Sequence, residues 1–255
     1  MKLALLSDVH ANVRALDACL DHARTQGAQQ FAILGDLVGY GAEPAAVVER
    51  VMALADSGAL VLQGNHDALA VQPPAPVAPG AAQTQTMQDA TAAWTHAQLS
   101  TAQRAFLADL PLEQRHPPVL LVHASAKTPQ QWLYVDSERR AAECLDAAGE
   151  DTRYVFVGHV HHQSVYFRGQ GRGLMQFEPV PGAALPVPAH RHWVATVGSV
   201  GQPRDGKPQA MYALFDQARA QLVFHRVAYD YWSAAAAVRA AGLPEPLAKR
   251  LEIGR

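Results

Sequence analysis

The sequence predicts an α/β protein whose strands form a mainly parallel sheet. Short apolar runs of strand type alternate with segments that carry apolar residues at helical spacing, and the loops between them are short. This succession is typical of parallel strands joined by right-handed crossovers. Size agrees, because 255 residues that are 49% hydrophobic and 17% charged can bury one full core. We therefore expect a single domain over residues 1–255.

The first elements have the clearest signals. Lys2 to Leu6 is a continuous apolar run of the buried-strand type. Asn12 can cap a helix that has apolar residues at helical spacing from Val13 to Ala23, and Gly27 closes it. The elements expected next are a strand at 31–34, a helix over 44–55 with Pro44 in its first turn, and a strand at 59–62.

The pattern changes after residue 70. A Pro-rich loop at 73–79 is expected to be a lid or a surface strap. Helices are predicted at 84–97, 101–107 and 137–147, with strands at 119–122 and 154–157. From Gln163 onward the sequence predicts a β meander, with strands at 164–167, 174–178, 193–196, 210–216 and 222–227. Two amphipathic segments at 231–241 and 245–251 are predicted to be the last helices.

Charge and hydropathy exclude several classes of partner. The formal net charge of −2 gives no basic field, so no long nucleic acid is expected as a partner. Ser7 and Asp8 come too early for a signal peptide, and no apolar stretch could span a bilayer, so we expect a cytoplasmic protein without a membrane partner. Cys19 and Cys144 are expected to be small buried hydrophobic residues. The sequence does not decide whether the protein forms a homo-oligomer.

Five predicted strands end in residues that can bind a metal ion. They are Asp8 and His10, Asp36, Asn65 and His66, His123, and then His159 and His161. In open α/β sheets the functional crevice lies at the carboxyl ends of the strands. Residues two apart on a strand project to the same side, so Asp8 with His10, and His159 with His161, can each supply two ligands to one place.

Each of these residues also has a simpler explanation when it is taken alone. Asp8 could stand beside a helix cap, His123 could be a buried core histidine, and Gly64 with Asn65 could form a tight turn. Five such groups in one order, all at strand ends, favour the metal interpretation instead.

These residues resemble the ordered motifs of the calcineurin-like metallophosphoesterases. The family pattern of D-x-H, G-D, G-N-H-D/E, H and G-H-x-H stands here at Asp8 to His10, Gly35-Asp36, Gly64 to Asp67, His123 and Gly158 to His161. The stretches GDLVGYGAEP and GSVGQPRDG (198–206) look like the small bacterial and archaeal branch. The resemblance implies an α/β sandwich of two β-sheets flanked by helices.

The resemblance also implies two divalent metal ions. By similarity, Asp8, His10 and His161 bind the first ion, Asn65, His123 and His159 bind the second, and Asp36 bridges them. Mixed imidazole and carboxylate ligands suit manganese, our first choice, or iron, zinc, cobalt or nickel.

The chemistry expected of such a site is hydrolysis of a small phosphate ester. Two divalent ions outweigh the charge of Asp8, Asp36 and a bridging hydroxide, so the site attracts a phosphate anion. Two metals lower the pKa of a bridging water, and the resulting hydroxide attacks phosphorus in line. His66 resembles the non-ligand histidine of the family and is expected to protonate the leaving oxygen, with Asp67 holding its ring. The expected substrate is a phosphodiester or phosphomonoester such as a nucleotide.

Two further residues have weaker signals for substrate binding. Asn12 could touch a bound phosphate, but a helix cap explains it equally well. Arg204 could bind a phosphate through its guanidinium group or could be an exposed hairpin arginine beside Asp205-Gly206.

Other functions are weighed against the hydrolase. A nuclease for single strands is disfavoured by the lack of basic surface and by few aromatic residues. A catalytically weak scaffold or binding module of the same fold is expected to lack some ligands, whereas this chain retains them all. A metal or phosphate sensor is distinguished by tight metal binding without turnover.

Overall fold

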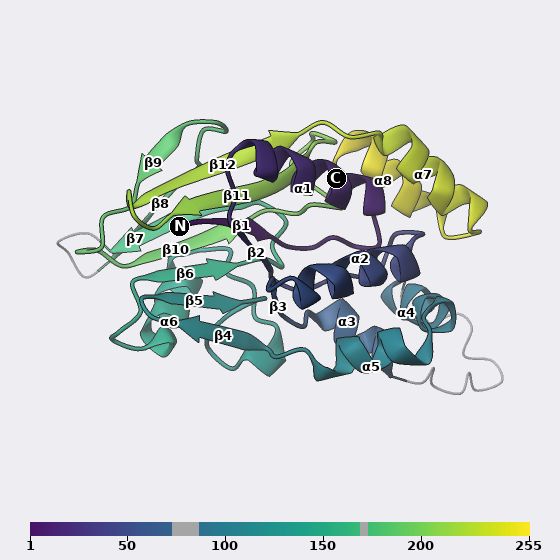
Figure 1. Ribbon diagram of the computed structural model, residues 1–255, viewed down its shortest axis with the longest axis horizontal. Coiled ribbons are helices and arrows are strands. Elements are labelled where there is room, and N and C mark those ends of the chain that lie inside the picture. The colour runs from purple at the N-terminus through teal and green to yellow at the C-terminus, as the bar shows by residue number, and fades with distance from the viewer. Residues whose placement is uncertain (73–86, 169–172) are drawn as a thin grey trace.

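The computed structural model describes residues 1–72, 87–168 and 173–255, in which two six-stranded β-sheets pack face to face with helices outside them (Figure 1). The first sheet has the order β3-β2-β1-β11-β12-β9. β1, β2 and β3 run parallel, and β11, β12 and β9 continue the sheet by antiparallel pairs. Its strands are β1 (Lys2–Leu6), β2 (Gln30–Ile33), β3 (Leu60–Val61), β9 (Ala184–Pro186), β11 (Ala210–Asp216) and β12 (Gln221–Val227).

The second sheet has the order β4-β5-β6-β10-β7-β8. β5, β6 and β10 run parallel, whereas β4, β7 and β8 pair antiparallel. Its strands are β4 (Glu113–His116), β5 (Val119–Val122), β6 (Tyr154–Val157), β7 (Gln163–Arg168), β8 (Leu174–Phe177) and β10 (Trp193–Val197). The parallel strands thus form one half of the first sheet and the centre of the second, which corrects the expectation of one mainly parallel sheet.

Helices form the outer layers, with α6 on the second sheet and α1 on the first (Figure 1). Asn12 begins α1 by accepting a hydrogen bond from the backbone N–H of Ala15, and Ser137 begins α6 in the same way. The helices are α1 (Val13–Thr25), α2 (Pro44–Asp56), α3 (Asn65–Val71), α4 (Met87–Gln98), α5 (Thr101–Asp109), the 3₁₀ helix η2 (Pro129–Gln131), α6 (Glu138–Ala148), α7 (Tyr231–Ala240) and α8 (Glu245–Ile253).

The core has layers that follow the alternation of side chains along the strands. On β1, Leu3 and Leu5 face the second sheet, whereas Ala4 and Leu6 face the helices. Phe156 and Phe215 meet between the sheets with ring centroids 5.1 Å apart. Full burial of a side chain of this size stabilises the fold by about 1.5–3 kcal/mol. This packing fixes one sheet against the other and so fixes the relative positions of their strand ends.

The predicted sandwich is confirmed, but the predicted meander is wrong. Its five strands are divided between the sheets, because β7, β8 and β10 belong to the second and β11 and β12 to the first. β10 lies between β6 and β7 and runs parallel to β6. Apolar alternation along the sequence predicts that a strand is present. Which strands it pairs with depends on the distant part of the chain that its apolar face covers. The polar β4 and the short β9 had no such signal and were not predicted.

Three other expectations concern the rest of the chain. The Pro-rich loop 73–79 lies outside the described residues, as do the first three positions of the helix expected from residue 84. Cys19 and Cys144 are free and buried, as expected. Among the residues that the structure describes, no helix is both long and apolar enough to cross a membrane.

Candidate metal centre

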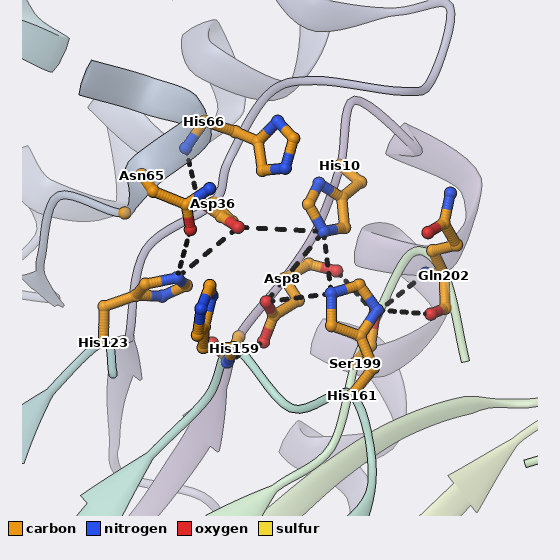
Figure 2. Close-up of polar contacts among 12 residues, drawn as sticks. Asp8, His10, Asp36, Asn65, His66, His123, His159, His161, Ser199 and Gln202 are labelled. Atoms are coloured by element: carbon orange, nitrogen blue, oxygen red, sulfur yellow. Dashed lines mark hydrogen bonds and ion pairs between the residues drawn. The ribbon is translucent and has the colours of Figure 1, made fainter. Parts of the chain in front are cut away.

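Seven side chains with metal-binding atoms meet where the parallel strands of both sheets end, and Figure 2 shows them pointing toward one another. The seven are Asp8 and His10 after β1, Asp36 after β2, Asn65 at the start of α3, His123 after β5, and His159 and His161 after β6. Asn65 is half-buried and the other six are buried. The structure thus brings together every ligand position that the motifs indicated.

The side chains form two adjoining clusters. Asp8, His10 and His161 offer ligand atoms that all lie within 4.8 Å of one another, and so do Asp36, His123 and His159. Asn65 joins the second cluster, because its Oδ1 is 3.2 Å from Nε2 of His123. Each cluster combines residues of both sheets, so the centre depends on their packing.

Asp36 lies between the two clusters. Its Oδ2 is 3.4 Å from Nε2 of His123 and 3.9 Å from Nε2 of His10. Its Oδ1 accepts a hydrogen bond from the backbone N–H of His66, at 2.8 Å. One oxygen of this carboxylate therefore faces both clusters while the other is tied to the start of α3.

Backbone carbonyls orient three of the histidines. Nδ1 of His10 is 3.1 Å from the carbonyl oxygen of Val38. Nδ1 of His123 is 2.7 Å from that of Leu34, and Nδ1 of His161 is 2.6 Å from that of Gln202. A carbonyl only accepts hydrogen bonds, so Nδ1 carries the proton and Nε2 of the neutral ring has a free lone pair. This is the usual support of a metal-binding histidine.

The atoms of the first cluster fit a bound cation. Nε2 of His10 and Nε2 of His161 are 3.1 Å apart, although both Nδ1 atoms already hold a proton. Asp8 Oδ1 is buried, has no hydrogen-bond partner among the described residues and lies 3.2 Å from Nε2 of His161. A cation satisfies these electron pairs together. Imidazole nitrogens with carboxylate oxygens suit a divalent transition metal.

The pKa values of the two histidines in the second cluster are shifted in opposite directions, upward for His123 and downward for His159. Burial lowers the pKa of His123, but the carboxylates of Asp36 and Asp8 and the carbonyl of Leu34 together outweigh it and raise that pKa to about 9. Burial, followed by the nearby His123, lowers the pKa of His159 to about 4. The cluster thus attracts positive charge at His123, where a proton and a metal ion compete for Nε2.

The backbone around these residues is locally left-handed. The positive φ angles are 55° at Asp8, 48° at His10, 52° at Asp36, 64° at His159 and 63° at His161. Such conformations cost about 1–3 kcal/mol each for residues with side chains and gather at functional sites.

The backbone also corrects the expectation that Asp8 with His10, and His159 with His161, converge because they are two apart on a strand. β1 ends at Leu6 and β6 at Val157, so both pairs stand on turning loops, and His159 and His161 face different clusters.

The segment between β10 and β11 supports the first cluster, a role that the motif analysis did not assign. The hydroxyl of Ser199 donates to the carbonyl of Asp8 at 2.8 Å, and the backbone N–H of Gly201 donates to the same oxygen at 2.9 Å. The carbonyl of Gln202 holds His161. The stretch GSVGQPRDG was the available signal, but its contact with residues almost two hundred positions earlier was not readable from it.

His66 and Asp67 lie at the start of α3. His66 is buried, and its ring packs against Tyr40 at 4.3 Å and His10 at 5.1 Å between centroids. The expectation that Asp67 holds the His66 ring is wrong. Its carboxylate accepts from the backbone N–H groups of Leu37, Val38 and Gly64. Consecutive helical residues do not face each other, so Asp67 instead ties the loop after β2 to the helix.

Asn12 and Arg204 both have hydrogen-bond partners within the chain, but they differ in where their side chains lie. Asn12 accepts from Ala15, and its amide nitrogen donates to the carbonyl of Gly201 and the hydroxyl of Tyr229. These contacts favour the helix-cap interpretation. Arg204 is half-buried, and its Nε and Nη2 donate to Oε1 of Gln202 at 3.3 and 2.9 Å. Its guanidinium carbon lies 5.9 Å from the centroid of the Tyr40 ring. Because Tyr40 covers His10 and His66, Arg204 stands at the edge of the centre.

Comparison with known families agrees with this geometry. The family model of the calcineurin-like phosphoesterase superfamily domain matches residues 1–219. The chain belongs to this superfamily, whose members depend on metal ions.

Relatives cover nearly the whole chain. An uncharacterised protein of Methanocaldococcus jannaschii is 30% identical over 99% of this chain and 98% of its own length. The crystal structure of a metallophosphoesterase from Sphaerobacter thermophilus is similar with a TM-score of 0.86 and 33% identity, over 100% of this chain and 99% of that one. A hypothetical protein of Pyrococcus horikoshii OT3 shares the fold, with a TM-score of 0.77 and 20% identity over 100% and 98% of the two chains.

Proposed function

We propose that this protein is a phosphoesterase that uses two divalent transition-metal ions to hydrolyse a small phosphate ester, a phosphodiester or phosphomonoester such as a nucleotide. The observation that carries the proposal is the pair of adjoining clusters with the Asp36 oxygen facing both. In this proposal Asp8, His10 and His161 hold one ion, Asn65, His123 and His159 hold the other, and Asp36 bridges them. When bound, such ions stabilise charge on phosphoryl oxygens and lower the pKa of water.

The other residues of the centre then have distinct roles. His66 is close to Asp36 and His10 yet packs mainly against Tyr40, which supports its assignment as the proton donor to the leaving oxygen. Arg204 is the cation at the rim, and its guanidinium group suits a phosphoryl oxygen. Asn12 is left out of the substrate site because its amide is already bonded.

Reconstitution tests the proposal. The purified protein is treated with a chelator, reloaded separately with manganese, iron, zinc, cobalt or nickel, and assayed on nitrophenyl phosphate and bis(nitrophenyl) phosphate. We expect about two ions per chain and turnover with at least one metal, manganese being our first choice. Binding of two ions with no turnover on a broad ester panel would instead favour the scaffold or sensor.

A pair of histidine variants sharpens this experiment. His161→Ala removes a first-cluster ligand, whereas His190→Ala changes an exposed histidine in the loop between β9 and β10. We expect His161→Ala to lose metal and activity together and His190→Ala to keep both. Equal metal content and turnover in the two variants would contradict the assignment of the first cluster.

A further inference from the structure

An exposed aromatic ring stands at the edge of the second cluster. The ring of Tyr134 stacks on that of His159, with centroids 4.1 Å apart and planes 23° from parallel. Tyr134 is nevertheless 49% exposed. A ring that is covered on one face and half exposed has its other face open to solvent beside the centre.

The loop that carries Tyr134 is held in place on both sides. Val135 is 1% exposed and packs into the core between the second sheet and α6, and Ser137 caps that helix. Before it, Trp132 has a left-handed φ of 52°, and its ring makes a T-shaped contact with that of His123, with centroids 5.8 Å apart. Conformational strain of this kind is kept where the surroundings impose it. Tyr134 is therefore a fixed surface rather than a freely rotating side chain.

The two flanks of the centre differ in chemistry. On the side of the first cluster, Tyr40 is covered by His10 and His66, and the guanidinium group of Arg204 lies over its ring. On the side of the second cluster, Tyr134 offers an uncovered aromatic face. The first flank suits phosphoryl oxygens, and the second suits a planar apolar group.

We infer that Tyr134 is a stacking surface for a planar aromatic group of the substrate, so that the protein selects aromatic phosphate esters such as nucleotides over aliphatic ones. This inference rests on the proposed function for the position of the phosphate group. It adds a specificity determinant outside the metal ligands. Stacking on an aromatic ring tolerates different bases, because each has a flat π face.

Binding of two related phosphates isolates the stacking surface from catalysis. AMP and ribose 5-phosphate both carry a ribose 5′-phosphate group, and AMP alone has a base. We expect calorimetric titration of the metal-loaded protein with the methylenephosphonate analogues of both ligands, which cannot be hydrolysed, to give about tenfold tighter binding of the AMP analogue, within the range measured for base stacking on aromatic side chains. Tyr134→Phe is expected to keep this ratio and Tyr134→Leu, which still covers His159, to bring it close to one.

A control variant and the turnover assay distinguish failure of the stacking inference from failure of the proposed hydrolase activity. Trp232→Leu changes an aromatic side chain that is 61% exposed on α7, and we expect it to leave the ratio unchanged. An unaltered preference for AMP in Tyr134→Leu, or equal binding of both ligands by the unmodified protein, would overturn the inference. If the preference depends on Tyr134 but no ester is turned over, the stacking surface stands and the proposed hydrolase activity fails.

Discussion

At the scale of single residues, the backbone and the side chain of His66 have different roles in the centre. Its backbone N–H donates to Asp36 Oδ1 at 2.8 Å, whereas its ring packs on Tyr40. Burial lowers the pKa of the ring, and the Asp36 carboxylate opposes this shift. The neutral ring can donate a hydrogen bond from its N–H, whereas transfer of a proton to the leaving oxygen uses the imidazolium form. Changing the side chain removes the ring but leaves the backbone contact that helps to position Asp36.

The first prediction uses this separation. We expect His66→Asn to keep both metal ions and to lower kcat on an alkyl phosphate ester by about 10²- to 10⁴-fold, the usual contribution of a general acid. The nitrophenyl ester should be much less affected, because its leaving oxygen needs little protonation. Metal analysis together with kcat on both esters checks this, and an unchanged kcat on the alkyl ester would remove His66 from the role.

His225 gives a second prediction, away from the centre. It is 9% exposed, stacks on Tyr212 at 4.7 Å, and its buried Nε2 has no hydrogen-bond partner among the described residues. Burial, followed by the charge of His22, lowers its pKa to about 4 from the ordinary 6.5. Between these values the unfolded chain binds more protons, so stability is lost as the pH falls through this window.

The variant His225→Phe keeps a ring on Tyr212 but cannot titrate. We expect its free energy of unfolding to fall less than that of the unmodified protein between about pH 6.5 and 4, by up to about 3 kcal/mol. Urea unfolding of both proteins across this range, with metal content matched, measures the difference. Parallel pH profiles would show that His225 does not contribute.

At the scale of elements, the segment from Gly198 to Arg204 links the ends of both sheets. Gly201 approaches the loop after β1 so closely that an added Cβ would lie 1.7 Å from the carbonyl oxygen of Val9. The backbone N–H of Gly201 donates to the carbonyl of Asp8 at 2.9 Å. Any larger residue must therefore displace the loop that carries Asp8 and His10.

We expect Gly201→Ala to weaken metal binding at the first cluster and to lower turnover by at least about 10²-fold, because misplaced ligands lose the required geometry. Gly173→Ala is the matched control, since an added Cβ there meets nothing within 4 Å and no left-handed φ is required. Metal titration and kcat of the two variants make the comparison. Similar metal affinity in both would contradict a positioning role for this segment.

At the scale of the whole molecule, the proposed metal ions join the two sheets. Each cluster takes residues from the loops of both sheets, with Asp8 and His10 facing His161 and with Asp36 facing His123 and His159. A ligand that binds only the folded state stabilises it, by about 2.7 kcal/mol for each site at a hundred times its Kd.

Metal removal should therefore lower Tm. For a chain of this size a change of 1 kcal/mol shifts Tm by about 2–4 °C, so two ions at that saturation give a fall of about 10 °C or more after chelation. Calorimetry before and after chelator treatment measures it. Asp36→Asn, which removes the charge that faces both clusters, should show a much smaller fall. The same Tm with and without metal would argue against two ions held by the folded protein.

The sequence by itself determined most strands and helices and the identities of the seven candidate ligands. Local patterns suffice for these, because apolar periodicity reflects which face of an element is buried and the ligand motifs are short. The tertiary structure alone decided the division of the later strands between two sheets and the place of β10 between β6 and β7. It also decided the contacts of Asp67, Ser199 and Tyr134. Nε2 of His10 and Nε2 of His161 meet across 151 positions of sequence. Contacts of that separation depend on the packing of whole sheets, which no short stretch of sequence contains.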